Sequence, residues 1–148
     1  MDPVHEKGLP MFSPEELAYL ADQRLARLAT VDSTGQPTVD AVGFAFDRGR
    51  FVVGGRDLPA TRKYRNVVTG NTKVSLIVDD LRSVNPWRPR GIRVFGTARA
   101  VTRHGMFGHG DYLEIVPDIS WSWGIVTGHD DFRDDSFTPR RTVWDMRR

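Results

Sequence analysis

Hydrophobic and polar positions follow two different periods along this chain. Over residues 13–22 the apolar side chains are spaced as on one face of a helix. The segment opens with Ser13, Pro14 and Glu16, which is the order of an N-cap, a first-turn proline and a capping box. We therefore expect a short helix there. From Leu25 onward apolar and polar residues alternate, which is the period of a half-buried strand.

Alternation and short apolar runs predict six strands. The first three follow one another closely, with turns at residues 33–36 and 47–49, so we expect them to pair antiparallel. A second short helix, about residues 61–69 with Thr61 as its N-cap, comes before the fourth strand. Residues 84–91 contain two prolines and are expected to form a loop or bulge. The expected strands cover residues 25–31, 38–46, 51–53, 74–78, 92–101 and 112–123.

Six mostly antiparallel strands with two short helices indicate a mainly β protein in the form of a closed or partly closed barrel. A chain of 148 residues has room for one hydrophobic core. We expect an N-terminal leader over residues 1–12, the barrel over residues 13–125, and an extended arm or partly ordered tail over residues 126–148.

Composition narrows the class of protein. Hydrophobic residues make up 39% and charged residues 27%, as in ordinary globular proteins, and no apolar run approaches the ~20 residues that cross a bilayer. The N-terminus lacks the pattern of a signal peptide, and the absence of cysteine excludes disulfides and thiol chemistry. We expect a cytoplasmic protein without a membrane partner. A formal net charge of +2 is too small to indicate nucleic-acid binding.

Motifs for familiar catalytic sites are missing from the sequence. It contains no nucleophile elbow, no phosphate-binding glycine loop and no paired-histidine zinc motif, and we name no catalytic residue. The glycine-rich residues 104–110 include His104 and His109 but no third strong ligand. We interpret this segment as a flexible loop and expect no metal.

Basic side chains crowd between the third and fourth expected strands, in the sequence RDLPATRKYRN from Arg56 to Asn66. Lys63 and Asn66 are three residues apart on the expected helix and share a face. A cation and an amide donor near a helix N-terminus suit a phosphate and its neighbouring hydroxyls. The alternative is a solvated helix buried through Tyr64 and two valines. We favour phosphate binding.

Two further features suit a planar ligand. The second strand has small residues in its middle, Ala41 and Gly43, where a ring can approach the backbone, although relief of crowding in a tight barrel explains them equally well. Trp87 falls in an expected loop, so stacking on a cofactor or partner explains it better than core packing does. Trp121 and Trp123 share one face of a strand and are expected to pack in the core or at a dimer interface.

The order and spacing of these pieces resemble the pyridoxamine 5′-phosphate oxidase-like split-barrel proteins, particularly the small deazaflavin-dependent reductases of actinobacteria. The most specific piece is a third strand, a short loop and a K-x-x-N helix that leads into V-S-L-I-V. The resemblance covers residues 25–125 and implies a six-stranded antiparallel split β-barrel that forms a homodimer, with the cofactor in a groove between the chains. The matching segments are LARLATVDSTGQPTVDAVGFAFD, FVVGGRDLPATRKYRNVVTGNTKVSLIVDD, RVFGTARAV and ISWSWGI.

The resemblance also implies roles for individual residues. In such proteins the lysine of K-x-x-N binds the cofactor phosphate, the loop after the third strand adds contacts, the second strand flanks the ring through its backbone, and an aromatic residue comes from the other subunit. Arg56 is a departure, since several relatives place a small hydroxyl residue there. The implied cofactor-binding residues are Val39, Asp40, Ala41, Val42, Arg56, Thr61, Lys63, Asn66 and Trp87.

The activity that the resemblance implies is hydride transfer, in which the cofactor carries the reaction and the protein supplies position and electrostatics. The basic cluster fits coenzyme F420, an 8-hydroxy-5-deazaflavin with a phosphate and a polyglutamate tail, whereas FMN needs only the phosphate site. We therefore expect an oxidoreductase that reduces a small conjugated or quinone-like substrate with reduced F420. Two alternatives stay open: an FMN-binding oxidase or reductase, and a non-catalytic flavin or deazaflavin carrier.

Overall fold

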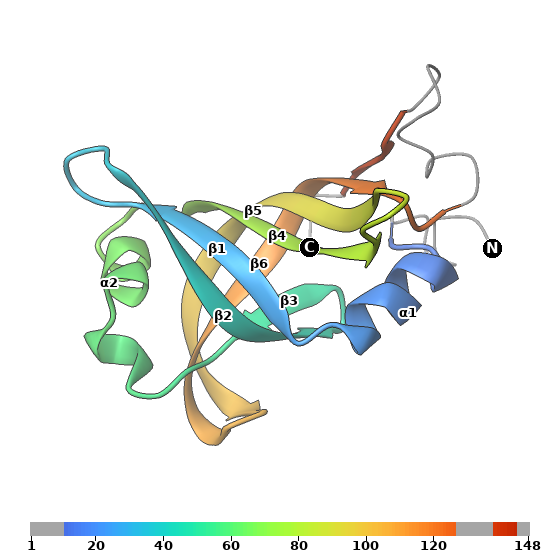
Figure 1. Cartoon of the computed structure of the whole chain (residues 1–148). Helices are drawn as coiled ribbons and strands as arrows, with labels where there is room; N and C mark the ends of the chain where they lie inside the picture. The colour runs from blue at the N-terminus through green and yellow to red at the C-terminus, as the bar shows by residue number, and fades with distance from the viewer. Residues whose placement is uncertain (1–10, 127–137, 145–148) are drawn as a thin grey trace.

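The computed structural model describes residues 11–126 and 138–144. Six antiparallel strands close into a barrel because β3 pairs with β6 as well as with β2, and β7 adds a further strand beside β6 (Figure 1). No helix in these ranges is long and apolar enough to span a bilayer. The elements are α1 (Pro14–Asp22), β1 (Leu25–Val31), β2 (Pro37–Asp47), β3 (Arg50–Val53), the 3-10 turn η1 (Leu58–Ala60), α2 (Arg62–Val68), β4 (Lys73–Ser83), β5 (Arg88–Gly105), β6 (Gly108–Trp123) and β7 (Arg140–Val143).

Alternate residues of each strand fill the barrel interior, as the period of two predicts. On β1, for example, Ala26 and Leu28 are buried while Arg27 between them is exposed. The two helices lie at opposite ends of the barrel (Figure 1). Phe12, just before α1, joins an aromatic group with Phe46, Phe51 and Trp144, at ring-centroid distances of 5.2, 6.1 and 4.8 Å. At the α2 end the core includes Leu58 and Val67.

Both predicted helix starts are confirmed. Ser13 and Glu16 form the capping box of α1, and the Thr61 hydroxyl accepts a hydrogen bond from the backbone N–H of Tyr64 at the start of α2. Residues 84–91 were expected to form a loop or bulge, and residues 84–87 form a turn. β5 already begins at Arg88, and the register between β4 and β5 shifts between Leu81 and Ser83, where they pair with Pro89 and Arg88. Pro89 is tolerated there because β6 ends opposite Gly91, so this part of β5 pairs with β4 alone.

The prediction of a flexible loop over residues 104–110 is also wrong. β5 continues to Gly105 and β6 begins at Gly108, so Met106 and Phe107 alone form the turn of a long hairpin. Gly108 has a φ of 85°, which a tight turn requires. The glycines of residues 104–110 were interpreted as a sign of mobility. In the structure, their lack of side chains makes room for a close turn.

Trp121 lies outside the barrel core. Its ring contacts Phe95 edge-on at a centroid distance of 5.0 Å, and the guanidinium of Arg93 lies 4.4 Å from the centroid of the Trp121 ring. Core packing is therefore wrong for this residue, and the dimer interface stays a prediction. Of the expected arm or tail, residues 127–137 and 145–148 are outside the described residues, whereas Arg140–Val143 form β7 and Trp144 is buried.

A buried carboxylate ties α1 to the C-terminal strand. Glu16 is 1% exposed, and its Oε1 accepts hydrogen bonds from the backbone N–H of Ser13 at 2.8 Å and from Nη1 of Arg140 at 2.6 Å. The hydroxyl of Ser122 donates to its other oxygen. Because a charge buried this deeply needs its partners, Glu16 couples the helix, β6 and β7 into one unit.

We expect Glu16→Gln to lower the free energy of unfolding by roughly 3 kcal/mol, since it leaves the mostly buried Arg140 without its counter-charge. Urea denaturation followed by Trp fluorescence measures this loss. Glu15→Gln is the matched control, because Glu15 is exposed on the same turn and its change should stay within about 0.5 kcal/mol. Equal effects of the two variants would contradict the assigned role of Glu16.

Candidate functional site

β2 has a strand partner on only one side over its first half. Residues 37–43 pair with β1, whereas β3 pairs only with residues 44–47. Within the described residues, the backbone groups of residues 39–42 that point away from β1 therefore have no strand partner. Val39 and Ala41 are exposed on this strand, Asp40 is half-buried, and Val42 points into the core. The result is an open backbone edge flanked by small side chains, which a flat molecule can approach closely.

Hydrogen bonds place α2 beside the start of this edge. The buried Asn66 amide donates to the Thr30 hydroxyl on β1 at 2.9 Å, and the Thr30 and Thr38 hydroxyls are 3.0 Å apart. Thr38 directly precedes Val39. The polar side chains thus form a continuous chain from α2 across β1 to β2, and they fix the helix against the strand that was predicted to flank a ring.

Four cations on or just before α2 form no ion pair with another described residue. Arg56, Arg62 and Arg65 are exposed, and Lys63 is half-buried. Hydrogen bonds from Thr34 and Gln36, with a smaller contribution from the charge of Arg62, lower the pKa of Asp32. Arg62 therefore lies close enough to the β1–β2 turn to influence it, and its place in the basic run is the signal that could have added it to the expected set.

Two of the predicted phosphate residues have structural partners instead. Thr61 donates its hydroxyl hydrogen to the Leu58 carbonyl at 2.6 Å while it caps α2. Asn66 is 6% exposed and uses its amide to hold the helix on β1. Direct contact of these side chains with a cofactor stays a prediction. Their observed contacts orient α2, on which Lys63 is carried.

Trp87 is not brought to α2 within one chain. It is 49% exposed in the turn after β4, whereas α2 precedes the other end of that strand. Eleven strand residues span about 35 Å, so the two ends of β4 are too far apart for one small ligand. A contribution of Trp87 to this site therefore requires a second chain, as the prediction from the sequence states.

An apolar groove lies next to the open edge, on the outer face of β1, β4 and β5. Its volume is about 510 Å³. Ala29, which lines it, is paired directly with the exposed Val39, so the groove lies one strand away from the open edge of β2. The lining also includes Val31, Pro37, Lys73, Ser75, Phe95 and Asp118.

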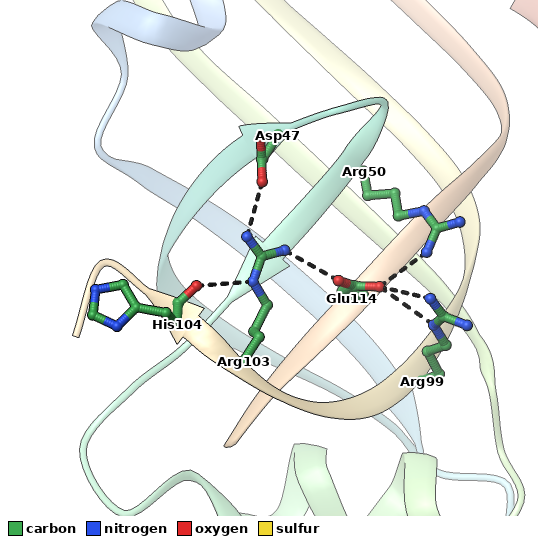
Figure 2. Close-up of polar contacts among 6 residues, drawn as sticks. All are labelled: Asp47, Arg50, Arg99, Arg103, His104 and Glu114. Carbon is green, nitrogen blue, oxygen red and sulfur yellow. Dashed lines mark hydrogen bonds and ion pairs between the residues drawn. The ribbon is translucent and has the colours of Figure 1, made fainter. Parts of the chain in front are cut away.

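On the outer surface of β3, three arginines surround one carboxylate (Figure 2). Oε1 of Glu114 accepts hydrogen bonds from Arg50 and Arg99, each at 3.0 Å, and its Oε2 accepts one from Arg103 at 3.1 Å. Arg103 also donates to Asp47 at the end of β2, at 2.8 Å. We call these residues the arginine cluster. The arginine cluster cannot be recognised in the sequence, because its members become neighbours only through the pairing of the strands.

The arginine cluster is largely neutralised from within. Burial raises the pKa of Glu114, but hydrogen bonds from Arg99, Arg50 and Arg103 outweigh it and hold that pKa below its usual value. The hydrogen bond to Asp47 likewise raises the pKa of Arg103. These groups therefore stay charged and paired near neutral pH. The cluster fastens the β5–β6 hairpin to β2, whereas the unpaired cations lie around α2.

A barrel closed by a short β3, with an open backbone edge beside it, defines the split-barrel class of fold. The chain belongs to the pyridoxamine 5′-phosphate oxidase family, whose model matches residues 12–116. It is 35% identical over 120 residues to the 5a,11a-dehydrotetracycline/5a,11a-dehydrooxytetracycline reductase of Streptomyces rimosus, across 77% of this chain and 84% of the relative. The resemblance inferred from the sequence is thus confirmed.

Solved structures share the fold at lower identity. An F420 reductase superposes with a TM-score of 0.59 at 22% identity, over 74% of this chain and 98% of its own. A conserved hypothetical protein from Mycobacterium tuberculosis gives a TM-score of 0.60 at 19% identity, over 76% and 84% of the two chains. The heme storage protein HutZ from Vibrio cholerae gives 0.54 at 18%, over 71% and 89%. At these identities the likeness establishes the fold alone.

The lowered pKa of Glu114 predicts a pH-dependent contribution to stability. A carboxyl with a depressed pKa stabilises the fold above its unfolded pKa, ~4.3, and loses that contribution as the pH falls through the folded value. We expect Glu114→Gln to lower the free energy of unfolding most at about pH 6–7 and progressively less below about pH 4. Asp111→Asn, at an exposed position on the same strand, is the control. A Glu114→Gln deficit that grows toward acid pH would refute this.

Proposed function

We propose that this chain is a homodimeric reductase that transfers hydride from reduced coenzyme F420 to a small conjugated or quinone-like molecule. The observation that carries the proposal is the open backbone edge of residues 39–42 beside a helix that carries unpaired cations. The edge can bind the polar rim of a planar ring through N–H and C=O groups, and the cations can bind a phosphate. A cytoplasmic location, predicted from the sequence, accords with this role.

Each group in the proposed site has a distinct task. Lys63 and Arg56 hold the phosphate, with Arg62 beside them, because none of these side chains forms an ion pair with another described residue. Thr61 and Asn66 keep α2 in place through the cap and the bond to Thr30. Since α2 has only seven residues, its dipole adds little, and the side-chain charges supply most of the attraction.

The chain is an oxidoreductase, and its chemistry requires no acid or base from the protein. Reduction of a conjugated C=C bond takes a hydride from the reduced coenzyme and a proton from water, so the substrate gains two electrons and two hydrogens and the coenzyme leaves oxidised. The residues of this site bind, orient and shield the reactants. Reduction of a dehydrotetracycline by the Streptomyces relative supports a conjugated ring system as the substrate class.

The dimer in this proposal accounts for the apolar groove and for Trp87. The groove lies one strand away from the open edge of β2, and its wall includes the exposed Phe95. A second copy that covers this face would bury the groove and bring its own Trp87 toward the Lys63 end of the site, which one chain cannot do. The cofactor would then lie between two chains, with the phosphate held by one and the ring enclosed by both.

We expect Lys63→Ala to weaken F420 binding by ~1–3 kcal/mol, because it removes a charge-assisted contact. Titration followed by quenching of Trp fluorescence measures the Kd, with FMN titrated in parallel. Arg65→Ala is the matched control, since Arg65 is an exposed cation on the same helix. Equal losses in the two variants would indicate general attraction rather than a phosphate site, and tighter binding of FMN would assign the protein to the flavin branch.

Mixing two defective variants tests whether the subunits share a site. Lys63→Ala and Trp87→Ala chains each lack one component, but a mixed dimer has one site with both. After unfolding and refolding together, random pairing should restore roughly a quarter of the high-affinity F420 sites. No restoration, with both variants folded, would contradict the placement of Trp87 across the dimer.

A further inference from the structure

β2 and β3 diverge at a pair of glycines. Phe44 is the last residue of β2 to pair with β3, opposite Val53, so Gly43 and Gly54 stand at the fork where the open edge begins. Phe107, from the turn of the β5–β6 hairpin, lies over both of them. A Cβ added at Gly43 would be 3.9 Å from the Phe107 ring, and one added at Gly54 would be 2.8 Å from it. At Gly54 the missing side chain makes room for the Phe107 ring, whereas a Cβ at Gly43 would only be in ordinary van der Waals contact with it.

The hairpin turn is held firmly in this position. The hydroxyl of Tyr112 accepts a hydrogen bond from the Phe107 N–H at 2.9 Å and donates one to the Gly108 carbonyl at 2.7 Å. The Tyr112 ring is 2% exposed and packs against Gly54 and Gly105. Nearer the barrel, Arg103 binds Asp47 on β2. A side chain in this turn is therefore positioned by the fold.

Despite these contacts, the turn presents apolar surface to solvent. Phe107 is 63% exposed and Met106 is 44% exposed, and the Met106 sulfur is 3.8 Å from the Cβ position of Gly43. Ala41, two residues before Gly43 on β2, is also exposed and lies on the open edge. The exposed Phe107 ring and the Met106 thioether lie at the end of the open edge, beyond Ala41 and Gly43. Together they form a surface that suits the face of a flat, conjugated molecule.

We infer that Phe107, with Met106, forms the wall against which the planar substrate packs, and so sets the substrate preference of the site. This inference rests on the proposed function. The proposed function assigns the phosphate to the cations around α2, and it assigns the edge of the coenzyme ring to the backbone of β2. The uncharged surface at the fork therefore remains for the substrate. In this arrangement the Phe107 side chain contacts the substrate and not the coenzyme, so its removal leaves the affinity for F420 unchanged.

The test compares Phe107→Ala with Val143→Ala, a control that also removes an exposed apolar side chain but on β7. Three quantities are measured for each: the Kd for F420, the KM and kcat for menadione with reduced F420, and the Kd of tetracycline for the F420-loaded protein. We expect Phe107→Ala to raise the menadione KM and the tetracycline Kd by about tenfold. The F420 Kd, the kcat and all values for Val143→Ala should change by less than about twofold.

Phe107→Tyr, which keeps the ring, should restore the wild-type values, and a urea midpoint for each variant separates loss of fold from loss of contact. Unchanged KM and tetracycline Kd would overturn the inference, as would an F420 Kd weakened by the same factor, which would place the coenzyme at the wall. A wild-type chain that binds F420 but neither planar probe also overturns it. Failure of the wild type to bind F420 overturns the proposed function itself, and the inference with it.

Discussion

β3 is four residues long, and it is the strand that closes the barrel by pairing with both β2 and β6. A longer β3 would cover β2 along its whole length and leave no backbone group free. Because β3 ends at Val53, β2 keeps an unpaired edge, the chain leaves toward α2 through two glycines, and the cations of that segment come to lie beside the barrel. Exposed edges carry a risk of aggregation, so an open edge of this kind is most simply understood as a binding surface.

Charge is divided between two regions with opposite character. In the arginine cluster, the carboxylates of Glu114 and Asp47 satisfy their arginines, and the result is a fixed joint between the hairpin and β2. Around α2 the cations form no ion pair within residues 11–126 and 138–144. Charged residues that hold two strands together need counter-charges in the folded chain. Charged residues that bind a phosphate need to be without a counter-charge before the ligand binds. Basic residues therefore have a structural task in one region and, in the proposed function, a binding task in the other.

The sequence predicted the parts of the fold that depend on local rules. Both helix caps, the strand alternation and the turns at residues 33–36 and 47–49 depend on a few neighbouring residues, and they were confirmed. Strand ends were less predictable, since β5 begins earlier and continues further than its apolar alternation suggests. The arginine cluster and the position of Phe107 at the fork could not be predicted from the sequence, because they bring together residues that are far apart in it. Asn66 shows the same limit: its spacing from Lys63 is visible in the sequence, but its bond to Thr30 is not.

The β5–β6 hairpin explains how a family barrel can acquire its own substrate preference without new catalytic groups. Hydride transfer from a bound coenzyme requires mainly that the acceptor carbon be held at the right distance and angle, so selectivity depends on the surface that faces the coenzyme. In the proposed function, the barrel, the open edge and α2 bind the phosphate-bearing ring. The hairpin turn lies outside the barrel, and its residues can change without disturbing the core. The hydrogen bonds of Tyr112 and Arg103 fix the position of the turn. If the turn contacts the substrate as we infer, the identity of residues 106 and 107 determines which molecules fit against it.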